Sequence, residues 1–107
     1  MTTKITRGTG NVFADLGFPD AEERQTKLRL AYTINAILEE RGLTQTQAAK
    51  LLDATQPKVS ALARYKLDGF SVERLMTFLT ALDRDVQIVI KKKPRSRASG
   101  RISVEAA

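Results

Sequence analysis

Polar and basic side chains gather between Thr55 and Lys66. The segment reads TQPKVSALARYK and contains Gln56, Lys58, Ser60, Arg64 and Lys66. A glutamine amide matches the donor and acceptor that adenine exposes in the major groove, and a lysine ammonium donates to guanine. The segment has three basic residues and no acidic residue, which suits a polyanionic partner. We therefore interpret it as a DNA-reading segment.

These side chains need a helix to present them in one direction. Thr55 is expected to cap that helix, and Pro57 is tolerated in the first turn, where the backbone N–H lacks an intrahelical partner. Val59 and Leu62 are spaced to form its inward face. The residues left for solvent or a partner are Gln56, Lys58, Ser60, Ala61 and Arg64.

A second short helix is predicted just before it. Thr44 and Gln47 form a T-x-x-Q capping box, which marks a helix start. The apolar residues Ala48, Leu51 and Leu52 follow on one face, and Asp53 ends the helix. Two short helices joined by a tight turn are typical of a helix-turn-helix, whose second helix enters the major groove. The alternative is an ordinary helical hairpin in a small bundle.

Longer helices are expected on both sides of this pair. Residues 20–41 carry an apolar stripe from Leu30 to Leu38, and Gly42 suits the left-handed position after a helix. Ser71 is expected to cap a last helix ending near Leu82. We predict a mainly α protein, a compact helix-turn-helix bundle of about four to five helices. It occupies residues 20–91, between an N-terminal arm (1–19) and a basic, disordered tail (92–107).

One β-strand is predicted after the last helix. β-branched residues dominate this stretch, and Val86, Ile88 and Ile90 alternate with Gln87, Val89 and Lys91, which is a strand pattern. A lone strand leaves its backbone groups unpaired, so we expect it to pair with its copy in a symmetric homodimer. The alternative is pairing with residues 12–13 of the same chain.

The two terminal segments differ in chemistry. The N-terminal arm concentrates four apolar residues that need to be buried, either on the chain's own core or against a protein partner; they are Val12, Phe13, Leu16 and Phe18. Residues 86–107 carry a net charge of +5, whereas residues 20–85 are neutral. We expect the tail either to add non-specific phosphate contacts, to offer Ile102 and Val104 to a partner, or simply to aid solubility.

Composition argues against several other classes of protein. The chain has no cysteine and no histidine, so we expect no catalytic residue, no metal site and no cofactor. The acids Glu39 and Glu40 are better interpreted as helix surface, and we do not expect an enzyme. No apolar run approaches the roughly 20 residues of a membrane span, and no signal-peptide block begins the chain. We expect a cytoplasmic protein.

Sequence motifs add a family resemblance. The segments TQTQAAKLL and TQPKVSAL resemble the Cro/C1-type (XRE) helix-turn-helix family. The flanking pieces GNVFADLGF, RGLTQ, FSVERLMTFLTAL and DVQIVI are most similar to HigA-like antitoxins, and the resemblance covers most of residues 10–91. It implies a transcriptional regulator that binds double-stranded operator DNA as a dimer and represses its own operon, often as the antitoxin of a RelE-like toxin in a type II pair. The alternatives are a stand-alone phage-like repressor and an interaction module that has lost DNA binding.

The resemblance also implies roles for individual residues. Gln45 and Thr55 would touch phosphates, and Gln56, Lys58 and Ala61 would face bases. The apolar N-terminal arm would dock the toxin. This chain departs from the family at three positions where glycine is usual, namely Asp53, Tyr65 and Asp83.

Overall fold

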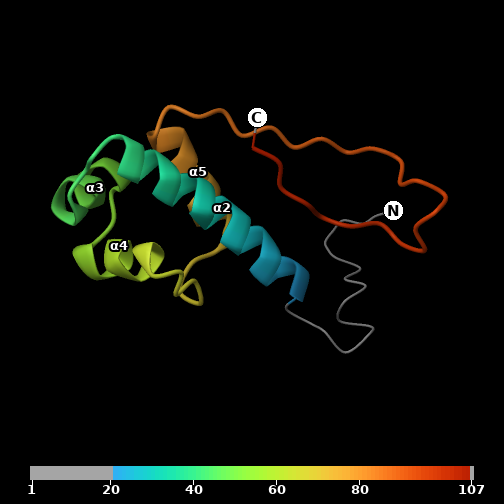
Figure 1. Ribbon diagram of the computed structural model, residues 1–107, viewed down its shortest axis with the longest axis horizontal. Helices are drawn as coiled ribbons and strands as arrows, with labels where there is room; N and C mark the ends of the chain where they lie inside the picture. The colour runs from blue at the N-terminus through green and yellow to red at the C-terminus, as the bar shows by residue number, and fades with distance from the viewer. Residues whose placement is uncertain (1–20, 107) are drawn as a thin grey trace.

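The computed structural model describes residues 21–106, which form four helices (Figure 1). Their bounds are α2 (Ala21–Glu40), α3 (Gln45–Leu52), α4 (Gln56–Ala63) and α5 (Val72–Ala81). The mainly α fold expected from the sequence is confirmed for this part of the chain. The N-terminal arm, with its four apolar residues, lies outside the described residues.

Three of the helices begin at the N-caps that the sequence predicts. The Thr44 hydroxyl accepts from the Gln47 N–H at 3.1 Å, and the Gln47 side chain accepts from the Thr44 N–H at 2.9 Å. This reciprocal pair satisfies two backbone donors that the helix start leaves free. The Thr55 and Ser71 hydroxyls cap α4 and α5 in the simpler, one-bond manner.

All four helices end at a residue in the left-handed conformation. These residues are Gly42, Asp53, Tyr65 and Asp83, with φ between 54° and 64°. In each case the next N–H reaches back to the carbonyl five residues earlier, as in Lys66 to Ala61 at 2.9 Å. The three positions where the resemblance implies glycine are therefore helix ends. Aspartate tolerates this conformation, whereas Tyr65 is expected to cost about 1–2 kcal/mol.

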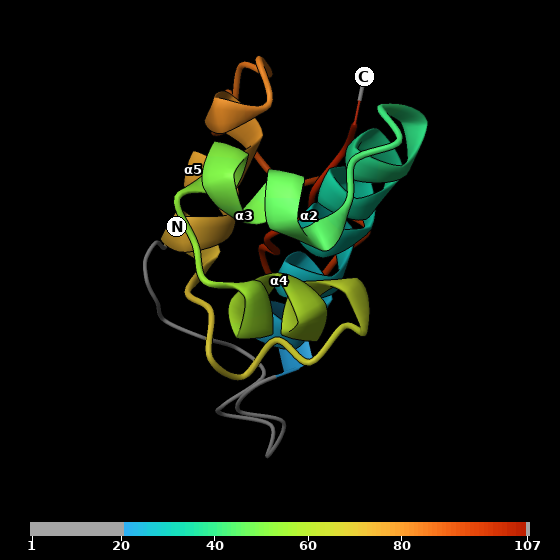
Figure 2. The same cartoon turned by 90° about the vertical axis from the view of Figure 1, so that its left-hand side faces the viewer.

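The core lies between α2 and α5, and the α3–α4 pair covers one end of it (Figure 2). Its largest fully buried side chains are Phe78, Ile34, Leu62, Leu75 and Leu82. The loop after α4 also contributes, because its two apolar side chains turn inward and the Phe70 ring meets the Phe78 ring edge-on at 6.0 Å. The core therefore fixes the position and tilt of the α3–α4 pair.

No β-strand occurs among residues 21–106, which differs from the expected strand over residues 85–91. A strand is defined by backbone hydrogen bonds to a neighbouring strand, and no segment among residues 21–106 pairs with residues 85–91 in this way. Val86 is half-buried against the core, whereas Ile88, Val89 and Ile90 are 74%, 75% and 93% exposed. The alternative partner, residues 12–13, lies outside the described residues. Dimer pairing through Val86, Ile88 and Ile90 stays a prediction.

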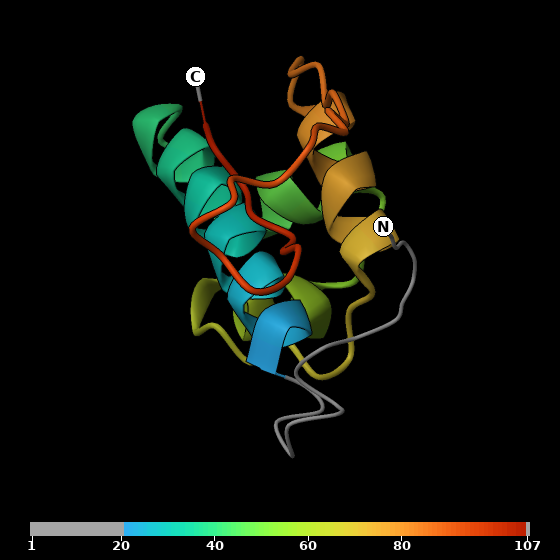
Figure 3. The ribbon, with the colours of Figure 1, turned by 90° about the vertical axis from the view of Figure 1, so that its right-hand side faces the viewer.

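The end of the chain folds back along α2, where the sequence predicted a disordered tail (Figure 3). The Ile102 N–H donates to the Glu22 carboxylate at 3.0 Å. Val104 packs against the hydrophobic core. Residues 84–101 therefore form a long loop that is attached to the bundle at both ends.

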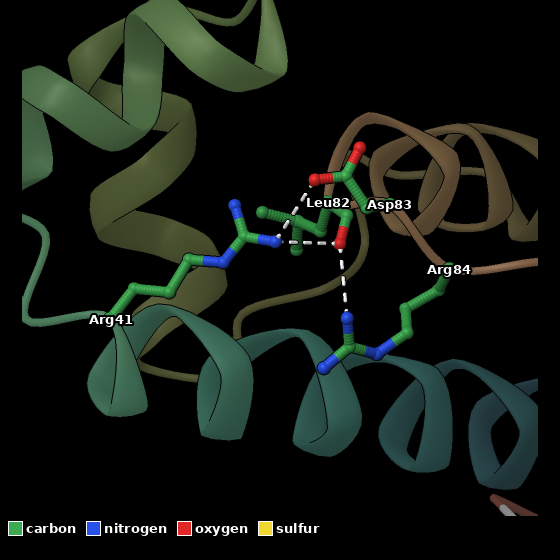
Figure 4. A network of polar contacts seen from close by, with 4 residues as sticks. All are labelled: Arg41, Leu82, Asp83 and Arg84. Carbon is green, nitrogen blue, oxygen red and sulfur yellow. Dashed lines mark hydrogen bonds and ion pairs between the residues drawn. The ribbon is translucent and has the colours of Figure 1, made fainter.

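The start of this loop is fixed by two arginines (Figure 4). Arg41, just after α2, donates to the Leu82 carbonyl at 2.9 Å and lies 3.4 Å from the Asp83 carboxylate. Arg84 donates to the same carbonyl at 3.2 Å. The carbonyl end of α5 is thus covered by two cations, a favourable placement for positive charge. The arrangement joins the ends of α2 and α5.

Candidate nucleic-acid interface

The outer face of α4 is polar and free of acidic residues. Pro57, Ser60 and Arg64 follow at i, i+3 and i+7, so they lie on one face of the helix. The opposite face holds Val59 and Leu62, which are 3% and 0% exposed. Pro57 and Arg64 are exposed and Ser60 is half-buried. The core therefore holds α4 by one face and leaves the other open.

Gln56 extends this surface toward α3. Its amide nitrogen donates to the Thr46 hydroxyl at 3.1 Å. An amide nitrogen carries two hydrogens, so one remains free beside the free carbonyl oxygen. The bond to Thr46 therefore orients the amide without using up the pair of groups that adenine requires. Thr46 was not expected to contribute, because a contact between residues ten apart has no local signal.

The predicted phosphate-contacting residues lie at the starts of the two helices. Gln45 is the first residue of α3 and is exposed. The Thr55 hydroxyl oxygen accepts from the Lys58 N–H at 3.3 Å. The hydrogen of the same hydroxyl can therefore be donated to a phosphate oxygen. The first backbone N–H groups of a helix lack intrahelical partners, which favours an anion at each of these starts.

Lys58 does not project from α4 as the sequence interpretation expected. Its ammonium donates to the Gly69 carbonyl at 2.8 Å and lies 4.9 Å from the centre of the Phe70 ring. The side chain is half-buried against the loop that follows α4. A carbonyl oxygen and an aromatic face are both favourable partners for an ammonium. In this structure Lys58 contacts the loop that follows α4, and its role in facing bases stays a prediction.

The remaining predicted residues divide between the outer face and the core. Ala61 is half-buried and packs against the core. The Arg64 guanidinium is exposed and donates to the Ser60 carbonyl at 3.3 Å, so it lies along the helix. Lys66 is exposed just after the helix end. The structure therefore brings Gln56, Ser60 and Arg64 together on one surface and separates Lys58 from them.

Arg74 supports the turn between the two short helices. Its guanidinium donates to the Asp53 carbonyl at 3.4 Å and lies 5.1 Å from the centre of the Phe78 ring. Asp53 is the left-handed residue that ends α3. The angle between α3 and α4 is therefore held from α5. No local pattern predicts this role, since the bond joins residues 21 apart.

Residues 21–106 contain no group of three acidic, histidine or cysteine side chains placed to hold a metal ion. None of the four described helices is both long and apolar enough to span a bilayer.

A capped pair of short helices at a fixed angle, the second with an open polar face, defines a helix-turn-helix domain. Comparison with known proteins agrees, since the family described as "Helix-turn-helix domain" matches residues 12–91. A solved structure described as a "Putative XRE Family Transcriptional Regulator" is 70% identical and superposes with a TM-score of 0.80. The match covers 83% of this chain and 100% of that one. No curated protein matches. The chain belongs to the XRE family of helix-turn-helix proteins.

Proposed function

We propose that this protein is a transcriptional regulator that binds operator DNA sequence-specifically through α4. The observation that carries the proposal is the open outer face of α4, which is polar and free of acidic residues while its inner face is locked in the core. A helix held by one face is rigid enough to be inserted into the major groove as a unit. The name of the similar solved structure supports the same class of function.

The residues on and around the open face of α4 have separate roles in this proposal. Gln56 reads adenine with its amide already oriented by Thr46, and Ser60 lies one turn further along the groove-facing side. Arg64 reaches a guanine edge or a phosphate. Gln45, Thr55 and Lys66 hold the phosphate backbone around the groove, while Ala61 presents a methyl group.

The regulator is proposed to act as a homodimer. Residues 86–90 lie along the edge of the bundle opposite α4 (Figures 1 and 2), and their apolar side chains are mostly exposed. Pairing two such segments about a two-fold axis would give an isologous dimer. Two recognition helices about one turn of DNA apart, ~34 Å, read a palindromic operator.

We further propose that the protein is the antitoxin of a type II pair that represses its own operon. The support is the resemblance of the flanking segments to HigA-like antitoxins, including the apolar arm of residues 1–19. A RelE-like toxin is the expected partner. Co-expression with a small basic protein encoded in the neighbouring reading frame tests this: growth arrest that this chain relieves supports the antitoxin role. A frame with no toxicity favours a stand-alone repressor.

Operator binding itself is tested by selecting ligands from a randomised duplex pool and measuring their affinity. Gln56→Ala is expected to weaken binding to the selected site by about 1–3 kcal/mol and to relax discrimination at one base pair. Gln25→Ala removes an exposed glutamine from α2 and serves as the matched control. If Gln56→Ala bound the selected site with unchanged affinity and discrimination, the assignment of α4 as the base-reading helix would be contradicted. Failure to enrich any sequence would contradict the proposed function.

A further inference from the structure

The loop between α5 and the end of the chain is strongly basic. Its outer part, residues 91–101, is called the basic loop here; its charged residues are Lys91, Lys92, Lys93, Arg95, Arg97 and Arg101. We propose that the basic loop is a second DNA-binding surface, which binds phosphates outside the half-site contacted by α4 of the same chain. This inference rests on the proposed DNA-binding function.

The positive charge of the basic loop is not balanced by acidic residues within the loop, whereas the bundle is neutral. Residues 20–85 contain ten basic and ten acidic residues, whereas the basic loop contains six basic residues and no acidic one. Five of the six side chains are exposed, and Arg97 is half-buried. The ion pairs found among residues 21–106 join Lys27 to Glu23 and Arg41 to Asp83. The positive charge is therefore free to attract an external polyanion.

The basic loop is attached to the bundle on both sides. Well before its start, Arg41 and Arg84 donate to the Leu82 carbonyl at the end of α5 (Figure 4). At its end, Ile102 donates to Glu22. Beyond that, Val104 lines an apolar hollow of about 400 Å³ together with Leu28, Tyr32 and Tyr65. A segment tied at both ends loses less conformational freedom on binding than a free tail does.

The turn of the basic loop is also internally bonded. The Lys93 ammonium donates to the Arg97 carbonyl at 2.9 Å, and the Arg97 N–H donates to the Pro94 carbonyl at 3.2 Å. The Arg97 guanidinium donates to the Ser99 carbonyl at 3.3 Å. These bonds gather the cations at one tip. Clustered lysines and arginines without an acidic residue suit phosphate oxygens, so the proposed ligand of the tip is the sugar-phosphate backbone.

The tip lies at the far end of the molecule from the helix-turn-helix. In Figure 1 the α3–α4 pair and the tip occupy opposite ends of the long axis, and Figures 2 and 3 show them on opposite sides. A half-site docked on α4 is therefore remote from the tip of the same chain. Phosphates that the tip contacts belong to DNA outside that half-site, such as its flank.

The test uses the full-length protein with Lys91, Lys92 and Lys93 all changed to glutamine, and a control with all three changed to arginine. Affinity is measured against salt concentration on two duplexes: the selected operator alone, and the same operator with about ten extra base pairs on each side. The glutamine variant is expected to show a slope of log affinity against log salt that is shallower by about 2–3 on the extended duplex, because each lost phosphate contact removes about 0.9. Its slope on the short duplex, and both slopes of the arginine control, stay as in the unmodified protein.

Two results would overturn the inference. An unchanged slope on the extended duplex would show that the basic loop contacts no DNA, even if the variant lost binding to RNA or to an acidic protein. An equal decrease on both duplexes would place the loop on the half-site itself. Measurements on an extended duplex of random sequence test the DNA binding of the basic loop independently of sequence-specific reading by α4. A protein that does not discriminate operator from random duplex contradicts sequence-specific reading, while the slope change on the random duplex still tests the loop.

Discussion

The tie between Lys58 and the loop after α4 allows a stability prediction that the sequence did not suggest. Lys58→Ala removes a bond from an ammonium to the Gly69 carbonyl and a contact with the Phe70 ring. A bond from a charged donor contributes about 1.5–3 kcal/mol when buried and less at this half-exposed site, and an exposed cation–π contact adds about 0.5–1 kcal/mol. We therefore expect a loss of about 1–2 kcal/mol in the free energy of unfolding.

Urea denaturation and thermal melting followed by circular dichroism measure this loss. In a domain of this size each kcal/mol lowers Tm by roughly 4–8 °C. Lys50→Ala, at an exposed position of α3, is the matched control and is expected to change stability by less than about 0.5 kcal/mol.

Gly69→Ala tests the same tie from the other side. A Cβ at Gly69 would lie 2.8 Å from the Lys58 ammonium, so the flexible lysine must move away. The variant is expected to lose part of the same stability while freeing the ammonium for DNA, and therefore to bind operator at least as well as the unmodified protein. The reasoning is refuted if Lys58→Ala keeps full stability but loses operator discrimination as severely as Gln56→Ala. That outcome would place Lys58 on a base.

Further expectations concern the caps, the dimer and the N-terminal arm. Thr55→Ala removes the cap of α4 and should lower stability by about 1 kcal/mol in urea denaturation, whereas Thr55→Ser should retain it. Ile88→Asp should convert a dimer to monomers in sedimentation experiments, while Gln87→Asp, on the other face, should not; a monomeric unmodified protein would exclude strand pairing. Deleting residues 1–19 should abolish capture of a co-expressed toxin and spare operator binding, and intact co-purification would count against the docking role.

Helix positions were largely predictable because their signals are local. Thr44, Thr55 and Ser71 cap helices in the structure as their side chains and spacing indicate. Gly42 takes the left-handed position after α2. Each of these features depends on residues within one or two turns, so the sequence alone contains the information.

The direction of long side chains was less predictable. Lys58 is spaced to leave the core face of α4, yet its ammonium turns to a carbonyl eleven residues away. Gln56 meets Thr46, and Arg74 meets Asp53, across similar gaps in sequence. Leu67 and Phe70 are buried from a loop with no apolar periodicity. All of these depend on how the helices pack, which residue spacing does not specify.

For the C-terminal segment, prediction from the sequence was limited for a different reason. The alternation from Val86 to Ile90 indicates a strand, but a strand also requires a partner, and one chain does not reveal whether a copy provides it. The compositional expectation of a disordered tail after residue 91 stays a prediction. The contacts of Ile102 with Glu22 and of Val104 with the core could not be read from composition, because they join the two ends of the described chain.

The small contribution of α4 to the hydrophobic core affects how such regulators can change their DNA specificity. Only Val59 and Leu62 of α4 are buried, whereas α2 and α5 supply most of the remaining interior. Exchanging the outward side chains of α4 therefore leaves the folded scaffold almost unperturbed, since surface substitutions usually change stability by less than about 0.5 kcal/mol. Duplicated genes can acquire new target sequences through a handful of mutations, each tolerated by the fold at the moment it arises.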